Sequence, residues 1–203
     1  MLRHHISPRD ALAGVILNTE TLRISPGITL VPVSLSHAAA LSTMVQENQA
    51  HLNTYLPVVT ALATLEAAQE HLRHVIAGTD DGDLFEWHIF SGDQLSGAIR
   101  IHHFEKLHHK ASIAYYIDAR QQGAGLATMS ARAVIAQCFR RLKLNRIELR
   151  CAADNLGSQR VAKRLGFTWE GMLRQAEWND GVFVDHFVYS LLRQDAGALL
   201  QSA

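Results

Sequence analysis

The sequence predicts a mixed α/β (α+β) fold in which helices flank a mostly antiparallel central sheet. Three alternating or β-branched runs follow one another through short connections, as in an antiparallel meander, over residues 84–90, 95–104 and 111–118. Helical and strand periods then alternate along the chain. Two last strands, 167–178 and 182–192, flank the turn Asn179-Asp180-Gly181. This order of elements disfavours a doubly wound parallel sheet.

One strand and two helices precede the meander. A β-branched run predicts a strand over 28–33. Helical spacing predicts a helix over 36–48, with Ser36 as its N-cap and Ala39, Leu41, Met44 and Val45 facing the core. A second helix is expected over 64–78, and the segment 51–59 between the two helices is expected to be a loop.

After the meander the spacing predicts two helices, 126–142 and 156–166, with a strand over 146–153 between them. The sequence contains no internal repeat and no low-complexity linker. The chain is therefore expected to form an N-terminal extension, one domain and a peripheral C-terminal tail, over residues 1–22, 23–192 and 193–203.

Composition excludes several kinds of partner. Lys and Arg together number 19, as do Asp and Glu, so a formal net charge of zero gives no reason to expect nucleic acid or an anionic membrane. No apolar run approaches the ~20 residues of a membrane helix. The two cysteines, Cys138 and Cys151, are too few for a disulfide framework or a zinc site. We expect a cytoplasmic protein, with His4 and His5 in a mobile terminus.

A glycine-rich stretch from Arg120 to Gly125 lies between a predicted strand and a predicted helix. Free N–H groups at a helix start attract anions, and glycine lets the backbone approach them closely. The stretch lacks the Lys-Ser/Thr ending of a P-loop. It is not a dinucleotide-binding motif either, because Thr128 stands three residues after Gly125. On these residues alone an ordinary glycine turn is the better interpretation.

Two motifs together resemble the GNAT (Gcn5-related) N-acetyltransferases. The stretch from Arg120 to Gly125 fits the Arg/Gln-x-x-Gly-x-Gly/Ala pattern of that family's pyrophosphate loop. Asn155, Ser158 and the run Leu165-Gly166-Phe167 resemble its second signature. The resemblance covers residues 22 to 192 and implies acetyl-CoA as co-substrate, with no metal. It implies a cradle of backbone N–H groups from Gln122, Gly123, Ala124, Gly125, Leu126 and Ala127, and an oxyanion donor near Ile117.

Within the family, the runs "NTYLP", "DNLGS" and 166–192 most resemble the RimJ/RimL-type enzymes, which acetylate the N-terminal amine of ribosomal proteins. This resemblance implies direct transfer to a primary amine in a ternary complex, and a homodimer. Two alternatives remain open. The acceptor could be a small amine, such as a polyamine, an aminoglycoside or an amino-acid-like toxin. The protein could also be a non-catalytic acyl-CoA-binding module.

The resemblance also implies roles for individual side chains. Glu177 is the candidate general base, acting through a water, although a solvated edge-strand carboxylate is the alternative. Ser158 is the candidate acid for the departing thiolate, with backbone bonding in the helix as its alternative. Asn155 is expected to cap that helix and to hold the pantetheine arm, and Tyr189 ranks second as the acid.

Several other residues are candidates for a role in binding or chemistry. Tyr55 and Leu56 lie where relatives fold a lid over the acceptor, although packing on the sheet is equally expected. Glu170 rivals Glu177 as the base but is expected at an exposed turn or bulge. Cys151 reads as a small hydrophobic residue. His102 and His103 are neighbours in a strand, so they are expected on opposite faces and cannot chelate a metal together; His108 and His109 lie in a loop.

Overall fold

The computed structural model describes residues 20–201 and confirms the predicted fold class. The strands are β1 (Leu22–Ser25), β2 (Ile28–Pro32), β3 (Phe85–Ser91), β4 (Gln94–Glu105), β5 (Lys110–Ile117), β6 (Arg146–Ala152), β7 (Thr168–Asn179) and β8 (Val182–Leu192). They form one sheet in the order β1-β2-β3-β4-β5-β6-β8-β7. β5 and β6 pair in parallel, and the other neighbouring pairs are antiparallel.

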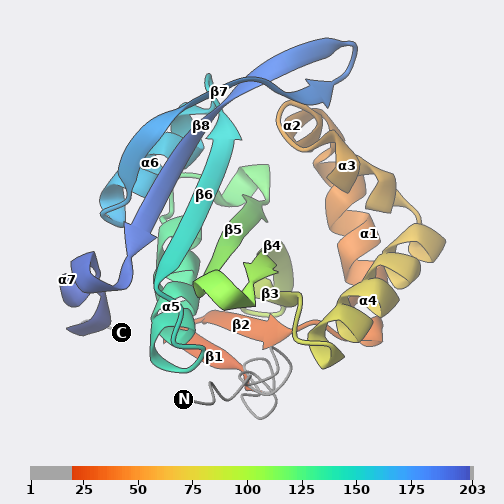
Figure 1. Ribbon diagram of the computed structural model, residues 1–203. Coiled ribbons are helices and arrows are strands. Elements are labelled where there is room, and N and C mark those ends of the chain that lie inside the picture. The colour runs from red at the N-terminus through yellow and green to blue at the C-terminus, as the bar shows by residue number, and fades with distance from the viewer. Residues whose placement is uncertain (1–19, 202–203) are drawn as a thin grey trace, which may run out of the picture.

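Helices cover both faces of this sheet (Figure 1). They are α1 (Ala38–Glu47), α2 (Gln49–Asn53), α3 (Pro57–Thr60), α4 (Leu65–Asp80), α5 (Leu126–Arg140), α6 (Leu156–Arg164) and α7 (Gly197–Gln201). Adjacent strand residues pack into different clusters: Ala98 and Tyr116 lie with α1 and α4, whereas Ile99 and Ile117 lie with α5. Because successive side chains of a strand point to opposite faces, α1 to α4 cover one face and α5 and α6 the other.

Some local predictions are wrong. The expected loop over 51–59 contains the end of α2 and most of α3, which begins with Pro57 at a position that suits proline. Ser34, not Ser36, is the capping serine: its hydroxyl accepts the Ser36 N–H at 3.3 Å in a 3-10 turn that precedes α1. Helix α1 consequently begins at Ala38, which is buried, while Ala39 is exposed.

Residues near both ends of the described chain take part in the sheet or the core, although the sequence predicted that they are peripheral. Strand β1 starts at Leu22 and pairs with β2, so it lies across the predicted domain boundary. In the expected peripheral tail, Ala196 and Leu199 are buried in the main core. His4 and His5 lie outside the described residues. In the described part of the chain, no helix is long and apolar enough to span a membrane.

The parallel pair of β5 and β6 is joined along only half of its length. Residues Lys110–Ile113 pair with Arg146–Leu149. Beyond that point β5 pairs with β4 alone, and β6 pairs with β8 as far as Ala152. The two strands therefore splay apart toward their carboxyl ends.

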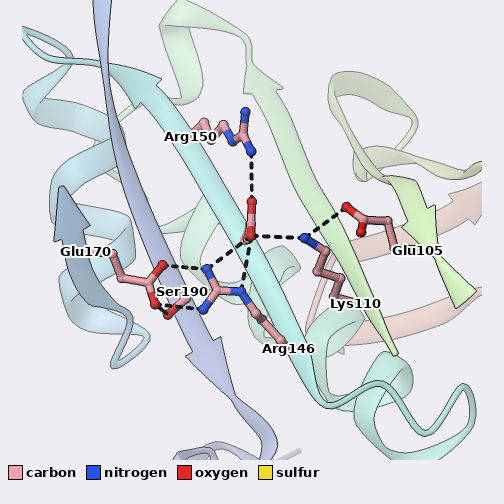
Figure 2. A network of polar contacts seen from close by, with 7 residues as sticks. Glu105, Lys110, Arg146, Arg150, Glu170 and Ser190 are labelled. Atoms are coloured by element: carbon pink, nitrogen blue, oxygen red, sulfur yellow. Dashed lines mark hydrogen bonds and ion pairs between the residues drawn. The ribbon is translucent and has the colours of Figure 1, made fainter. Parts of the chain in front are cut away.

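The joined end carries a network of charged side chains on one face of the sheet (Figure 2). Glu148 accepts hydrogen bonds from Arg146 Nε and Arg150 Nη2, each at 3.1 Å. Arg146 also donates to Glu170 at 2.7 Å, and the Ser190 hydroxyl donates to the same carboxylate at 2.7 Å. Lys110 pairs with Glu105 at 2.9 Å. The Arg146 contact lowers the pKa of Glu170 to about 2, so this carboxylate is a poor proton acceptor at neutral pH.

The expectation that His102 and His103 face apart is wrong. A bulge interrupts the pairing of β4 with β5 between His102 and Glu105, and His103 takes a φ of +51° there. The ring centroids of the two histidines are consequently 4.3 Å apart. Burial lowers the pKa of His102 to about 4. Within residues 20–201, no group of three or more His, Cys, Asp or Glu side chains is arranged to hold a metal ion.

Candidate active site

A cleft of about 580 Å³ opens where β5 and β6 splay apart. Four segments line it: α2 with the residues that follow it, the end of β5, the glycine loop with the first turn of α5, and α6 with the two residues before it. The stretches 51–56, 115–128 and 154–164 are far apart in the sequence, and the sheet brings them together.

The glycine loop supplies one wall of the cleft. Gly123 and Gly125 have φ values of +79° and +80°, a conformation that side chains strongly disfavour. Gly125 is the N-cap of α5, and no side chain of residues 20–201 caps that helix. The first N–H with an intrahelical partner belongs to Met129, which donates to the Gly125 carbonyl at 2.9 Å. The N–H groups of the first turn therefore remain available, together with the partial positive charge of the helix start.

The loop residues agree only in part with the predicted cradle. Gly123, Gly125, Leu126 and Ala127 all line the cleft, and so does Gln122. The Gln122 N–H, however, already donates to the Ala119 carbonyl at 3.3 Å. Ala124 is not among the lining residues, while Thr128, which the prediction omitted, is one of them.

A polar bracket fixes the base of the loop. The buried Asp118 carboxylate accepts bonds from Arg120 at 2.9 Å through its backbone N–H and at 2.6 Å through Nη2. Arg120 also pairs with Glu47 at 2.6 Å, and Asn48 Oδ1 accepts the Ala119 N–H at 2.8 Å. Hydrogen bonding to Arg120 lowers the pKa of Asp118, so the bracket stays charged at neutral pH. Sequence reasoning missed Glu47 and Asn48, because their contacts join residues more than 70 positions apart. It also missed Asp118, although the contacts of Asp118 with Arg120 are local.

The splayed end of β5 presents backbone groups to the opening. Asp118 N–H donates to the Ser96 carbonyl at 2.8 Å, on the β4 side. Since hydrogen-bonding direction alternates along an antiparallel strand, the Ile117 N–H faces away from β4, toward the gap. Ile117 lines the cleft at this point.

Helix α6 brings two predicted residues to the opposite wall. Asn155 Oδ1 accepts the Ser158 N–H at 3.0 Å, so the expected N-cap is confirmed. Ser158 and Tyr115 both line the cleft. The Tyr115 hydroxyl is buried, and burial raises its pKa to about 12, a shift that a polar contact with Ser158 opposes. Two hydroxyl groups, both protonated at neutral pH, therefore lie beside each other in the cleft.

Tyr189 and Cys151 lie outside the lining of the cleft. Tyr189 is buried in the main core, so the expectation that it packs there agrees with its surroundings. Cys151 is buried in the same core, and burial raises the pKa of its thiol to about 11. A protonated thiol is a poor nucleophile.

Glu177 lies on the hairpin of β7 and β8 and is not among the residues that line the cleft. Its carboxylate is 3.0 Å from His186 Nε2. A bulge between Leu173 and Glu177, in which Gln175 has a φ of +51°, offsets this part of the strand. The hairpin arches toward α2 (Figure 1), where Asn179 Nδ2 donates to the Thr54 carbonyl at 3.3 Å.

The lid candidates Tyr55 and Leu56 line the cleft from the other side. The Tyr55 hydroxyl donates to the Asp154 carbonyl at 3.4 Å, just before α6. The segment between α2 and α3 therefore contacts both the start of α6 and the tip of the hairpin. The lining also includes charged residues that sequence reasoning did not single out, Asp154, Arg160 and Arg164.

Comparison with known proteins gives one consistent family. The family model described as "Acetyltransferase (GNAT) domain" matches residues 28–168. The ribosomal-protein-serine acetyltransferase of Escherichia coli (strain K12) is 28% identical over 172 residues, which cover 85% of this chain and 96% of that relative.

Two solved structures agree with this match. The structure described as RimL, a ribosomal L7/L12 alpha-N-protein acetyltransferase in complex with coenzyme A, has a TM-score of 0.82 and 28% identity, covering 85% of this chain and 98% of its own. An acetyltransferase from Salmonella typhimurium, described as modifying the N-terminal serine of 50S ribosomal subunit protein L7/L12, has a TM-score of 0.78 and 27% identity, covering 85% and 99%.

Proposed function

The chain belongs to the GNAT family of acetyltransferases, and on that premise we propose that it acetylates the N-terminal α-amine of a protein, with a ribosomal protein as the leading candidate. The observation that carries this proposal is the cleft between the splayed strands, which joins an uncapped helix start to a pair of hydroxyl groups. Acetyl-CoA is the co-substrate that such a cleft fits.

The residues present fit two parts of coenzyme A, the pyrophosphate and the arm that carries the thioester. The uncapped start of α5 and the two left-handed glycines suit a pyrophosphate group, because backbone N–H groups and the helix dipole both favour an anion there. The Ile117 N–H, which faces the gap, suits the carbonyl oxygen of the thioester or an amide of the pantetheine arm. When bound, acetyl-CoA supplies the activated acetyl group.

In the proposed reaction the acceptor nitrogen forms a bond to the thioester carbon, and the bond from that carbon to sulfur breaks. Glu177 takes the proton of the amine through a water, which is a modest demand because an α-amine has a pKa of about 7.7 to 8.0. The Ile117 N–H donates to the developing oxyanion. Ser158 gives a proton to the departing thiolate and lies beside the Tyr115 hydroxyl.

We propose direct transfer of the acetyl group in a ternary complex, and the surroundings of Cys151 support this. An acetyl-enzyme formed on Cys151 would need an activated thiol, and burial keeps this thiol protonated. Tyr55 and Leu56 line the cleft from the segment between α2 and α3, and in this proposal they contact the acceptor.

We also propose a homodimer and a cytoplasmic location. The hairpin of β7 and β8 exposes large apolar side chains, with Trp178, Val182 and Phe183 each 60% exposed. Exposed apolar groups gathered in this way favour association, and a second copy of the chain is the proposed partner. Light scattering after size-exclusion chromatography would return the mass of a monomer if this part of the proposal is wrong.

The experiment that tests the function is a thiol-release assay with acetyl-CoA and a panel of acceptors. The panel contains peptides beginning with Ser, Ala or Met, the same peptides with a formylated N-terminus, polyamines, aminoglycosides and free amino acids. We expect turnover with the free peptides and none with the formylated controls. Turnover with only a small amine would leave the enzyme class standing and reject the peptide acceptor. Tight coenzyme binding with no turnover on any acceptor would favour a non-catalytic module.

A further inference from the structure

Two arginines line the cleft from α6 at positions four residues apart. Arg160 and Arg164 are both exposed, and their spacing places them on the same face of the helix, one turn from each other. Elsewhere in the protein, Arg120 and Arg146 are paired with carboxylates at 2.6 and 2.5 Å. Among the described residues, no carboxylate forms an ion pair with Arg160 or Arg164. Two uncompensated guanidinium groups therefore face the same cleft.

These arginines lie further along α6 than Ser158 does. At a rise of about 1.5 Å per residue, Arg160 and Arg164 stand roughly 3 and 9 Å further along α6 than Ser158. Asp154, the carboxylate of the lining, lies on the other side of Ser158, next to Tyr55. The lining that α6 supplies therefore changes along the helix, from a carboxylate and a hydroxyl group near its start to two cations further on.

The pyrophosphate already has a site that does not require these arginines. The uncapped first turn of α5 and the left-handed glycines form that site on the facing wall. Coenzyme A carries a further phosphate, the monoester on the 3′-hydroxyl of its ribose. A phosphate monoester bears about −1.5 to −2 charges at pH 7, and guanidinium groups bind such oxygens in a forked geometry.

We propose that Arg160 and Arg164 form a subsite for the 3′-phosphate of coenzyme A. The protein consequently distinguishes coenzyme A from dephospho-coenzyme A, which has a hydroxyl group at that position. This inference rests on coenzyme A as the co-substrate and is independent of the identity of the acceptor. The two phosphate groups of the cofactor are then held in different ways, the pyrophosphate by backbone N–H groups and the monoester by side-chain cations.

The test compares the Kd values of coenzyme A and dephospho-coenzyme A, measured by calorimetry without any acceptor. The wild-type protein is expected to bind coenzyme A at least about 10-fold more tightly, the ratio that one charge-assisted contact provides. The double variant R160Q/R164Q should lose that preference, with a weaker Kd for coenzyme A and an unchanged Kd for dephospho-coenzyme A. The matched control is K163Q, which removes one exposed charge from the same helix outside the cleft and should keep the preference.

Two results would overturn the proposal. An equal loss of affinity for both ligands in a variant that still unfolds cooperatively would assign the arginines to the pyrophosphate. An unchanged preference would show that they do not contact the monoester.

A pH series adds a second readout. The wild-type preference should fall as the pH drops below about 6, where the monoester takes up its second proton, and the double variant should show no such trend. Because no acceptor is present, a wrong acceptor assignment leaves this test intact.

Discussion

The two ends of the β5–β6 pair use polar groups in opposite ways. At the joined end, Glu148 and Glu170 are both held by Arg146, and the carboxylates and cations of the network satisfy one another (Figure 2). At the splayed end, no side chain of the described residues caps the start of α5, and the Ile117 N–H faces an open gap. The same two strands thus carry a closed polar network and an open polar site.

The difference shows what separates a structural polar cluster from a binding site. Polar groups that are out of bulk water cost free energy unless they are paired, so a folded protein normally pairs them internally. Groups left without an internal partner in a concave site remain free to bind a ligand. Charge alone does not separate the two ends, because the joined end contains more charged side chains than the cleft does. What separates the two ends is whether each polar group has a partner within the protein.

The largest expected effect comes from a substitution in the glycine loop, at the splayed end of β5 and β6. Gly123→Glu should weaken coenzyme A binding at least about 100-fold, because a side chain at a φ of +79° is strained and adds a negative charge beside the proposed pyrophosphate site. Calorimetric titration measures the change. Gly82→Glu is the matched control: Gly82 has a φ of +71° and open space around it, but it lies far from the cleft in the sequence and is not among its lining residues. Retained binding in the Gly123 variant would reject the loop as the cradle.

The second effect separates the two glutamates of β7. Glu177→Gln should lower turnover about 100-fold, the lower limit typical of a lost general base, while the Kd for acetyl-CoA stays within about twofold. Glu170→Gln should leave turnover nearly unchanged, since Glu170 belongs to the closed network. Steady-state kinetics on both variants check the contrast. Equal turnover in the Glu177 variant and the wild-type protein across the pH range would remove Glu177 from the mechanism.

A smaller effect is expected at the pair of hydroxyl groups of Ser158 and Tyr115. Ser158→Ala should lower kcat about 10-fold. It should not disturb the helix cap, because Asn155 bonds the backbone N–H of residue 158 and not its side chain. Tyr189→Phe should leave kcat unchanged, because Tyr189 is buried away from the cleft. The opposite pattern, a slow Tyr189 variant and a normal Ser158 variant, would make Tyr189 the acid.

The smallest effect concerns the stability of the closed network in acid. The pKa of Glu170 is about 2 in the folded protein and about 4.3 in an unfolded chain. Its ionised form therefore stabilises the fold above pH 4.3, and this contribution disappears as the pH falls toward 2. Because the side chain is 38% exposed, we expect a loss of about 1 kcal/mol. Urea unfolding at pH 5 and pH 2.5 should show this loss in the wild-type protein and not in the Glu170→Gln variant.

The sequence predicted those parts of the protein that depend on local patterns. The order of the larger elements, the Asn155 cap and the glycine loop all follow from residues close together in the chain. Contacts between distant segments were out of reach. Neither the pairing of Glu170 with Arg146 nor the bulges at His103 and Gln175 has a local signal, since both depend on neighbouring strands.

Some signals were present but not used. Pro57 suits the first turn of a helix and pointed to α3. The spacing of Arg160 and Arg164 after the Asn155 cap already placed two cations on one face of α6. Their importance becomes apparent only when the fold sets that face against the glycine loop.

The bracket of Asp118, Arg120, Glu47 and Asn48 has a consequence for the kinetics of coenzyme binding. Its hydrogen bonds hold the base of the glycine loop by contacts made during folding. The loop is therefore preorganised, and little further chain entropy is lost when the ligand arrives. Association should then be limited by diffusion and orientation, without a slow loop-ordering step. Variants that alter the affinity should act mainly through the residence time of the coenzyme.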